Sequence, residues 1–274
     1  MNKMLLGRTA IALTLTSVSL ACIGCAALTR EEAAEAVAEA ALEAEASSLT
    51  SGTIEITTEF TIGEAVEAAA GEIRTFVETQ LPCADVVLEG ATLTVTYGVR
   101  GGMCTYRGQS YSGTHSVSVM RNQMDEVIVE HTWTELSNGR VSVTGGATVT
   151  WSVADRTRRV VHELVWTRLS DGHTGTGRGD RLQGALPEGI ATGFTVSGDR
   201  SWEGESGRWS LDIDAVQMRW VDPVPQAGTY TLSTPFGKTL SMNFERVDAD
   251  SIQVTVASGA RSFDIVVNSA PMRE

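Results

Sequence analysis

The chain has 274 residues, of which 42% are hydrophobic and 20% are charged. This composition supports one substantial hydrophobic core and argues against an intrinsically disordered chain. The 34 acidic and 21 basic residues give a formal net charge of −13. Phosphate backbones require a basic surface, so the charge balance excludes nucleic acid as a partner.

The N-terminus is typical of a secretion signal. Lys3 and Arg8 make its start basic, and an apolar and small-residue stretch follows over residues 9–23. That stretch is shorter than the roughly 20 apolar residues that a membrane-spanning helix requires, and no second apolar run of that length follows it. We therefore expect export without a transmembrane helix.

Residues 19–25, with the sequence SLACIGC, resemble the lipobox of bacterial lipoproteins, in which a small residue precedes the cysteine that becomes lipidated. Cleavage before Cys25 would leave only Cys83 and Cys104, an even number, so Cys25 is the expected lipidation site. Cys22 is the alternative site, and an ordinary cleaved signal peptide is the alternative interpretation.

The resemblance implies a signal peptide over residues 1–24 and attachment to the membrane through a lipid anchor. Neither Ala26 nor Ile23, the residue after each candidate cysteine, is the aspartate associated with retention in the inner membrane. We therefore expect an outer-membrane lipoprotein of the cell envelope, and the membrane face stays open.

An acidic, alanine-rich segment follows. Thr29 and Glu32 have the spacing of a capping box, and four glutamates then repeat every fourth residue, at Glu31, Glu35, Glu39 and Glu43. We interpret residues 25–50 as a solvated acidic helix without partners, a spacer between the membrane and a single β-rich domain over residues 51–274.

A second helix is predicted over residues 62–81, with Thr61 as its N-cap and Pro82 as its stop. Its apolar residues follow the three-four spacing of one buried face: Ile62, Ala65, Val66, Ala69, Ile73, Phe76 and Val77. Before it, Ile54, Ile56 and Phe60 alternate with polar residues and suggest a strand that enters the domain.

The rest of the chain alternates in the way that strands do. Leu93, Val95, Tyr97 and Val99 alternate with threonines, and the same pattern recurs over residues 141–153. One apolar and one polar face indicate an antiparallel sheet with one side in a core. Similar strands continue to the C-terminus, and a phase change between Ile213 and Val216 indicates a β-bulge.

Two segments of similar sequence mark hairpins. Residues 133–139 read WTELSNG and residues 166–172 read WTRLSDG, and Asn-Gly and Asp-Gly favour tight turns. We predict a mainly β protein: a large twisted antiparallel meander sheet, open or an incomplete barrel, covered by one amphipathic helix over 62–81 and preceded by the Ala/Glu-rich helix.

Cys83 and Cys104 flank a strand-like segment and a Gly101-Gly102 turn. Two isolated cysteines without a second Cys or His pair make a poor zinc site, so we expect a structural disulfide, with no bound metal or cofactor.

The sequence contains no recognisable catalytic motif, and two functional hypotheses remain. The first is a noncatalytic envelope lipoprotein, either structural or a binding module for an apolar ligand or an envelope protein. A curved sheet under a helix would be similar in arrangement to lipoprotein carriers of the LolA and LolB type. The apolar cavity expected under the helix would be lined by Phe76, Tyr97 and Trp151.

The alternative is a secreted or periplasmic hydrolase. Asp212 and Asp214 alternate onto one face of a predicted strand, where folding could bring a histidine to them. The oligomeric state stays open.

Overall fold

The computed structural model describes residues 27–61, 66–102, 104–106, 109–121, 126–152, 154–189, 192–219 and 221–269. The expected signal peptide and both candidate lipidation sites, Cys22 and Cys25, lie outside the described residues.

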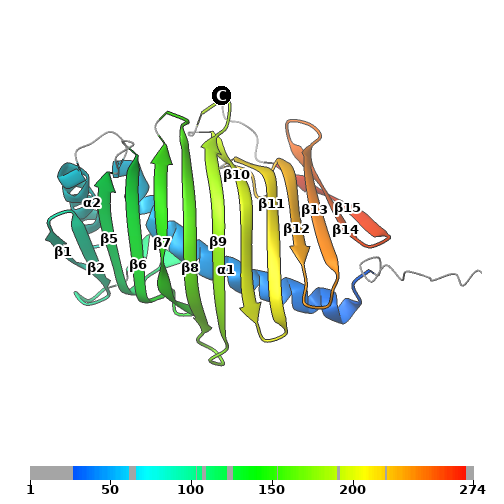
Figure 1. The fold of residues 1–274 in the computed structure, drawn as a ribbon, viewed down its shortest axis with the longest axis horizontal. Coiled ribbons are helices and arrows are strands. Elements are labelled where there is room, and N and C mark those ends of the chain that lie inside the picture. The colour runs from blue at the N-terminus through cyan, green and yellow to red at the C-terminus, as the bar shows by residue number, and fades with distance from the viewer. Residues whose placement is uncertain are drawn as a thin grey trace, which may run out of the picture.

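Two helices precede a long row of strands (Figure 1). The helices are α1 (Arg30–Thr61) and α2 (Val66–Gln80). The strands are β1 (Asp85–Glu89), β2 (Thr92–Tyr97), β3 (Thr105–Tyr106), β4 (Gln109–Ser110), β5 (Ser112–Arg121), β6 (Val127–Ser137), β7 (Val141–Ser152), β8 (Thr157–Arg168), β9 (Thr174–Ala185), β10 (Gly193–Gly204), β11 (Gly207–Arg219), β12 (Ala227–Ser233), β13 (Thr239–Arg246), β14 (Ser251–Ser258) and β15 (Arg261–Asn268).

Thirteen of these strands form one antiparallel sheet in which each strand pairs with its neighbours in the chain, from β1 to β15; only β3 and β4 form a separate pair. The order is linear, and β1 and β15 do not pair with each other, so the sheet is open. The predicted mainly β fold, with a large antiparallel meander, is confirmed.

The two predicted hairpin turns are also confirmed. Gly139 (φ 86°) lies between β6 and β7, and Gly172 (φ 75°) lies between β8 and β9. Beside them, the Asn138 side chain accepts a hydrogen bond from the backbone N–H of Val141 at 2.9 Å, and Asp171 accepts one from the N–H of His173 at 3.1 Å. These side chains close the turns locally. The predicted bulge is present in β11, at Ala215.

α1 is longer than the helix predicted over residues 25–50, and it packs on the sheet, whereas the prediction was a spacer outside the domain. It continues through Thr61, so the strand expected over residues 54–60 is wrong: this segment is helical. Leu42, Ala46, Leu49 and Thr53 are buried and follow three-four spacing, which gives the helix an inner stripe of small and apolar groups. α1 packs with this stripe on β5, β6 and β7.

The helix predicted over 62–81 is confirmed as α2. Ile73 and Val77 are buried, and the helix packs on β1, β2 and β5 at one end of the sheet. Thr61, expected as its N-cap, is instead the last residue of α1, and residues 62–65 lie outside the described residues. The sheet is thus covered by two helices, of which α1 crosses more of it.

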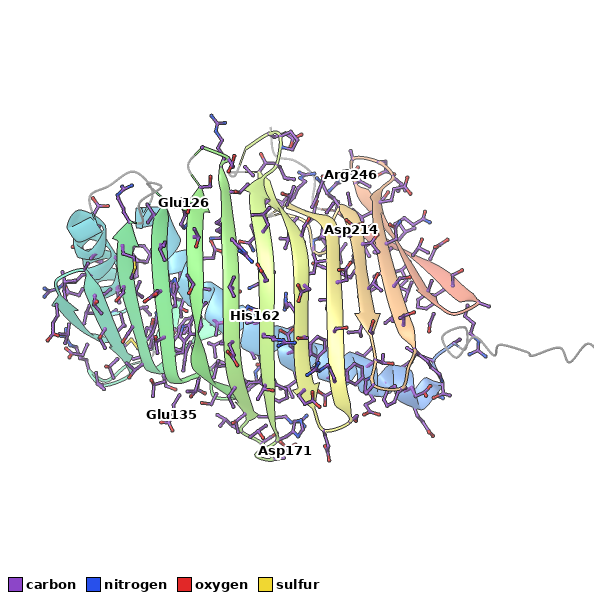
Figure 2. All side chains as sticks on the ribbon, in the orientation of Figure 1. Glu126, Glu135, His162, Asp171, Asp214 and Arg246 are labelled. Atoms are coloured by element: carbon purple, nitrogen blue, oxygen red, sulfur yellow. A yellow bond between two sulfur atoms is a disulfide. The ribbon has the colours of Figure 1, made fainter. Side chains whose placement is uncertain are left out.

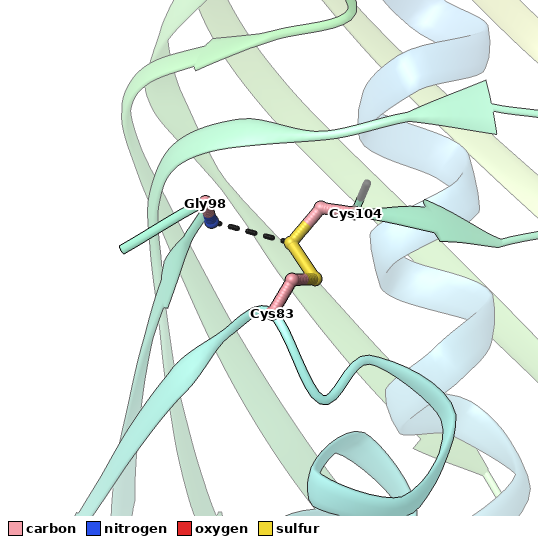
Figure 3. The surroundings of a disulfide bond; sticks show 3 residues. All are labelled: Cys83, Gly98 and Cys104. Atoms are coloured by element: carbon pink, nitrogen blue, oxygen red, sulfur yellow. Dashed lines mark hydrogen bonds between the residues drawn. A yellow bond between two sulfur atoms is a disulfide. The ribbon is translucent and has the colours of Figure 1, made fainter. Parts of the chain in front are cut away.

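Cys83 and Cys104 form the expected disulfide (Figure 3), with their Cα atoms 5.4 Å apart. The backbone N–H of Gly98 donates to Cys104 Sγ at 3.2 Å. The bridge ties the segment before β1 to the segment before β3, and a loop of this length stabilises a fold by about 3 kcal/mol.

Candidate ligand-binding surface on the inner face of the sheet

The acidic side chains of α1 bind basic groups of the sheet and its loops. Glu32 Oε2 lies 2.6 Å from Lys238 Nζ, and Glu45 Oε1 lies 2.7 Å from Arg140 Nε. The prediction of a solvated acidic helix without partners is therefore wrong. It failed because these partners lie far along the chain, where helical spacing gives no indication of them.

The first half of the sheet is filled under α1. Trp133, on β6, is 1% exposed, and its Nε1–H donates to Thr53 Oγ1 of α1 at 2.9 Å. His115 and His131 stack beside it, with His115 Nε2 and His131 Nδ1 3.0 Å apart. Burial lowers the pKa of His115 to about 3 and that of His131 well below its ordinary value, so both imidazoles are neutral in the folded chain.

Three arginines project from the inner positions of β8, β9 and β10. Arg200 Nη1 lies 2.8 Å from Glu43 Oε2, and in this pair Glu43 is buried and Arg200 is half-buried. Arg158 binds Glu55 of α1 and the side chain of Gln183. Both arginines therefore have carboxylate partners on α1.

The third arginine, Arg181 on β9, has no such partner. It is 7% exposed, and its Nε has no hydrogen-bond partner among the described residues. Neither an ion pair nor a hydrogen bond joins its guanidinium to any group in the described part of the chain. Burial, and secondarily Arg200, lower the pKa of Arg181 to about 9, whereas the charge of Glu43, which binds Arg200, acts in the opposite direction. An arginine this deeply buried is normally paired.

The glycines of β9 create the room for this arrangement. A Cβ at Gly179 would lie 2.6 Å from His162 Cε1 and 3.1 Å from Arg200 Cγ, so only glycine lets both side chains lie across the strand. His162 is itself buried, its Nδ1 has no hydrogen-bond partner among the described groups, and burial lowers its pKa to about 3. His162 therefore remains a neutral group beside Arg181.

Beyond Arg181, the inner face becomes apolar again. Val196, Ile213 and Val216 form a core cluster separate from the one under α1. Partly buried side chains surround this cluster: Phe194, Leu211, Met218 and Tyr230. The same face continues through Met242 on β13 and Val256 on β14 to β15, where Phe263 is 58% exposed and Ile265 is 45% exposed.

α1 does not extend over all of this face. Figure 1 shows the helix passing behind the sheet obliquely, from β6 to the lower ends of β12 and β13. Lys238, in the turn between these strands, binds Glu32 there. We call the apolar inner side chains of β10 to β15, with Arg181 at their border, the apolar face.

One buried polar network fixes the end of the apolar face. Asp222 binds Arg246 and accepts a hydrogen bond from Ser269 Oγ at 2.6 Å. Arg246 Nη1 also donates to Ser269 Oγ at 3.1 Å. This network joins the loop before β12, the end of β13 and the residue after β15, so the last strands are held by their polar groups.

The residues expected to line a cavity lie elsewhere. Phe76, on α2, packs edge-on against Tyr106, with ring centroids 5.8 Å apart, and Tyr97 packs against Tyr111 at 5.5 Å. Trp151 lies under the guanidinium of Arg158, 5.4 Å from its Cζ. The described contacts of all three are with other protein groups around the filled core, whereas the accessible apolar surface is on β10 to β15.

The structure does not assemble the Asp/His site of the hydrolase hypothesis. Asp212 and Asp214 are exposed on the outer face of β11, whereas His115, His131 and His162 are buried on the inner face. Figure 2 shows Asp214 well separated from His162. Among the described residues there is also no group of three or more His, Cys, Asp or Glu side chains that could hold a metal ion.

Sequence reasoning missed Arg181 and Arg200, the two charged groups that define the border of the apolar face. Both occupy inner positions of their strands, and a charge at an inner position is a signal in a pattern of alternation. The glycines of β9 obscured that pattern. Within the described residues, none of the helices has the length and apolarity needed to cross a membrane.

Comparison of the chain with models of known protein families, with curated proteins and with solved structures found no match.

Proposed function

We propose that this chain is a membrane-anchored envelope lipoprotein that binds an apolar ligand, without catalysis, on the apolar face. The observation that carries the proposal is the accessibility of that face. At the inner positions of β5 to β8 most side chains are buried. The inner positions of β12 to β15 divide: Leu232, Phe244, Ile252 and Val254 are buried, whereas Tyr230, Leu240, Met242 and Val256 are partly exposed and Phe263 and Ile265 are exposed. A contiguous exposed apolar surface is typical of a binding site.

The start of the described chain supports the anchored part of the proposal. The backbone N–H of Leu28 donates to Ser258 Oγ at 3.1 Å, at the end of β14. Cys25 is three residues earlier in the sequence. A lipid on Cys25 would therefore hold the last strands, and with them the exposed side chains of β15, close to the membrane surface.

The first test is mass spectrometry of the protein purified from the membrane fraction of cells that express the full chain. We expect the mass of a diacyl or triacyl modification on Cys25, and, under native conditions, a bound apolar molecule. An unmodified N-terminus would overturn the lipoprotein assignment. If the protein is lipidated but carries no bound molecule and binds no apolar probe, the proposed binding of an apolar ligand is wrong.

The second measurement locates the ligand with matched variants of β13. Met242 lies on the apolar face and is half-buried, whereas its neighbour Asn243 is exposed on the outer face. Met242→Gln preserves side-chain length but makes it polar, so it should weaken binding of an apolar probe severalfold. Asn243→Gln should leave binding unchanged. Equal effects of the two variants would exclude the apolar face as the site.

A further inference from the structure

Within the described part of the sheet, Arg181 differs from the neighbouring half-buried arginines, each of which binds a carboxylate. Around it, α1 provides Glu43 and Glu55, which bind Arg200 and Arg158 respectively. Three cations therefore face two anions at this place, and the unmatched charge is the one with 7% exposure. Burying an uncompensated charge is costly, so an anion bound beside Arg181 would offset that cost.

The neighbours of Arg181 favour an anion over a fourth protein group. Burial raises the pKa of Tyr230, on the apolar face, and the charges of Arg200 and Arg181 act in the opposite direction. Arg200 Nε, like Arg181 Nε, is buried and has no partner among the described residues. Two guanidinium groups with unused donors and a tyrosine hydroxyl suit a carboxylate or phosphate group.

The position of Arg181 also indicates what the anion is attached to. Arg181 pairs in register with Gly198 of β10, and Val196, two residues away on that strand, belongs to the apolar cluster with Ile213 and Val216. An anionic group held at Arg181 would therefore lie at the border of the apolar face. A ligand that filled both places would carry a charged group at one end and an apolar body at the other.

We propose that Arg181, with Arg200 and Tyr230, binds the anionic group of an amphiphile whose apolar part lies on the apolar face. This inference rests on the proposed apolar-ligand function and adds the charge of the ligand. The guanidinium fork of Arg181 accepts a carboxylate or a phosphate in the same bidentate way, so the shared chemistry is an oxyanion on an apolar chain.

The test titrates the full chain, purified in a non-ionic detergent, with hexadecanoate and with hexadecanol, and follows tryptophan fluorescence. Hexadecanoate should bind at least about tenfold more tightly than hexadecanol, the expected effect of one charge-assisted contact. Arg181→Gln should abolish this preference and leave hexadecanol binding unchanged. Arg181→Lys, which keeps the charge but loses the fork, should retain part of the preference.

Arg178→Gln is the matched control, because Arg178 lies on the same strand but is exposed on the other face. It should behave as the wild type does. If the wild type binds hexadecanoate and hexadecanol equally, the proposed anion site is wrong and the proposed apolar-ligand function stands. If it binds neither compound, both proposals are wrong. If acetate or inorganic phosphate binds as tightly as hexadecanoate, the apolar chain contributes nothing and the proposal of an amphiphilic ligand is wrong.

Discussion

The two halves of the sheet have the same alternation of apolar and polar residues, but their inner faces differ in how much of the apolar surface is buried. From β5 to β8, the inner face is filled by α1, and large side chains such as Trp133 and Trp166 are almost inaccessible to solvent. From β12 to β15, the inner side chains are also apolar, yet Phe263 and Ile265 remain exposed. Alternation therefore specifies which side of a sheet is apolar, but it does not specify what covers that side.

The boundary between the halves is polar. His162, Arg181 and Arg200 lie side by side across β8, β9 and β10. The main core continues past them through Trp202 on β10 and Trp209 on β11, and the separate cluster of Val196, Ile213 and Val216 lies on their other side. The comparison predicts that the filled half contributes most of the free energy of unfolding and that the unmatched charge at the boundary lowers it.

The largest expected effect on the filled half is acid destabilisation. His115, His131 and His162 are neutral when folded because burial lowers their pKa values. The unfolded chain takes up protons below about pH 6.5, so stability is complete above that pH and is lost as the pH falls towards about 3. Urea unfolding at pH 7 and pH 5 should differ by about 6 kcal/mol, or about 2 kcal/mol per histidine. A difference near zero would mean that these imidazoles are charged in the folded chain.

Single truncations should separate the two halves next. Trp133→Ala removes a buried ring and its hydrogen bond to Thr53, and should lower the free energy of unfolding by about 3–5 kcal/mol. Phe263→Ala, in the open half, should change it by less than about 0.5 kcal/mol because the ring is already solvated. The measurement is urea unfolding of both variants. Losses of similar size would show that β15 is covered in the intact protein.

Two substitutions test the boundary, and they should change the free energy of unfolding in opposite directions. Glu43→Gln leaves Arg200 without its carboxylate and should destabilise the chain by about 3 kcal/mol. Arg181→Met removes an unmatched charge and should stabilise the ligand-free chain by about 1 kcal/mol. Glu31→Gln, an exposed change on the same helix as Glu43, is the control. A destabilised Arg181→Met variant would mean that the guanidinium has a partner in the chain.

The sequence predicted local structure well where a local rule decides it. The Asn138-Gly139 and Asp171-Gly172 turns, the bulge at Ala215 and the disulfide all follow from residues close together in the chain or from cysteine parity. The meander follows because each strand pairs with the next. These features depend on turn chemistry and alternation, which a single sequence contains.

The candidate site could not be predicted in the same way. The glutamates of α1 repeat at a spacing that suggests a solvated face, and their role depends on partners such as Arg200, which is separated from Glu43 by 157 positions. The helical continuation of α1 through Ile54 and Ile56 was mistaken for a strand because those residues also alternate. Tertiary packing decided both features, and it overrides local pattern.

α1 and the residues just before it connect β5, β6 and β7 with the last strands of a sheet that is otherwise built by pairing of neighbours. Glu32 reaches Lys238 across 206 positions and Leu28 reaches Ser258 across 230, whereas each strand needs only the hairpin before it. α1, which is synthesised before every strand, therefore has no complete surface to pack on until the last strands exist. Strand pairing can proceed from β1 onwards, but docking of α1 is a late, long-range step, and it places Leu28 beside the end of β14.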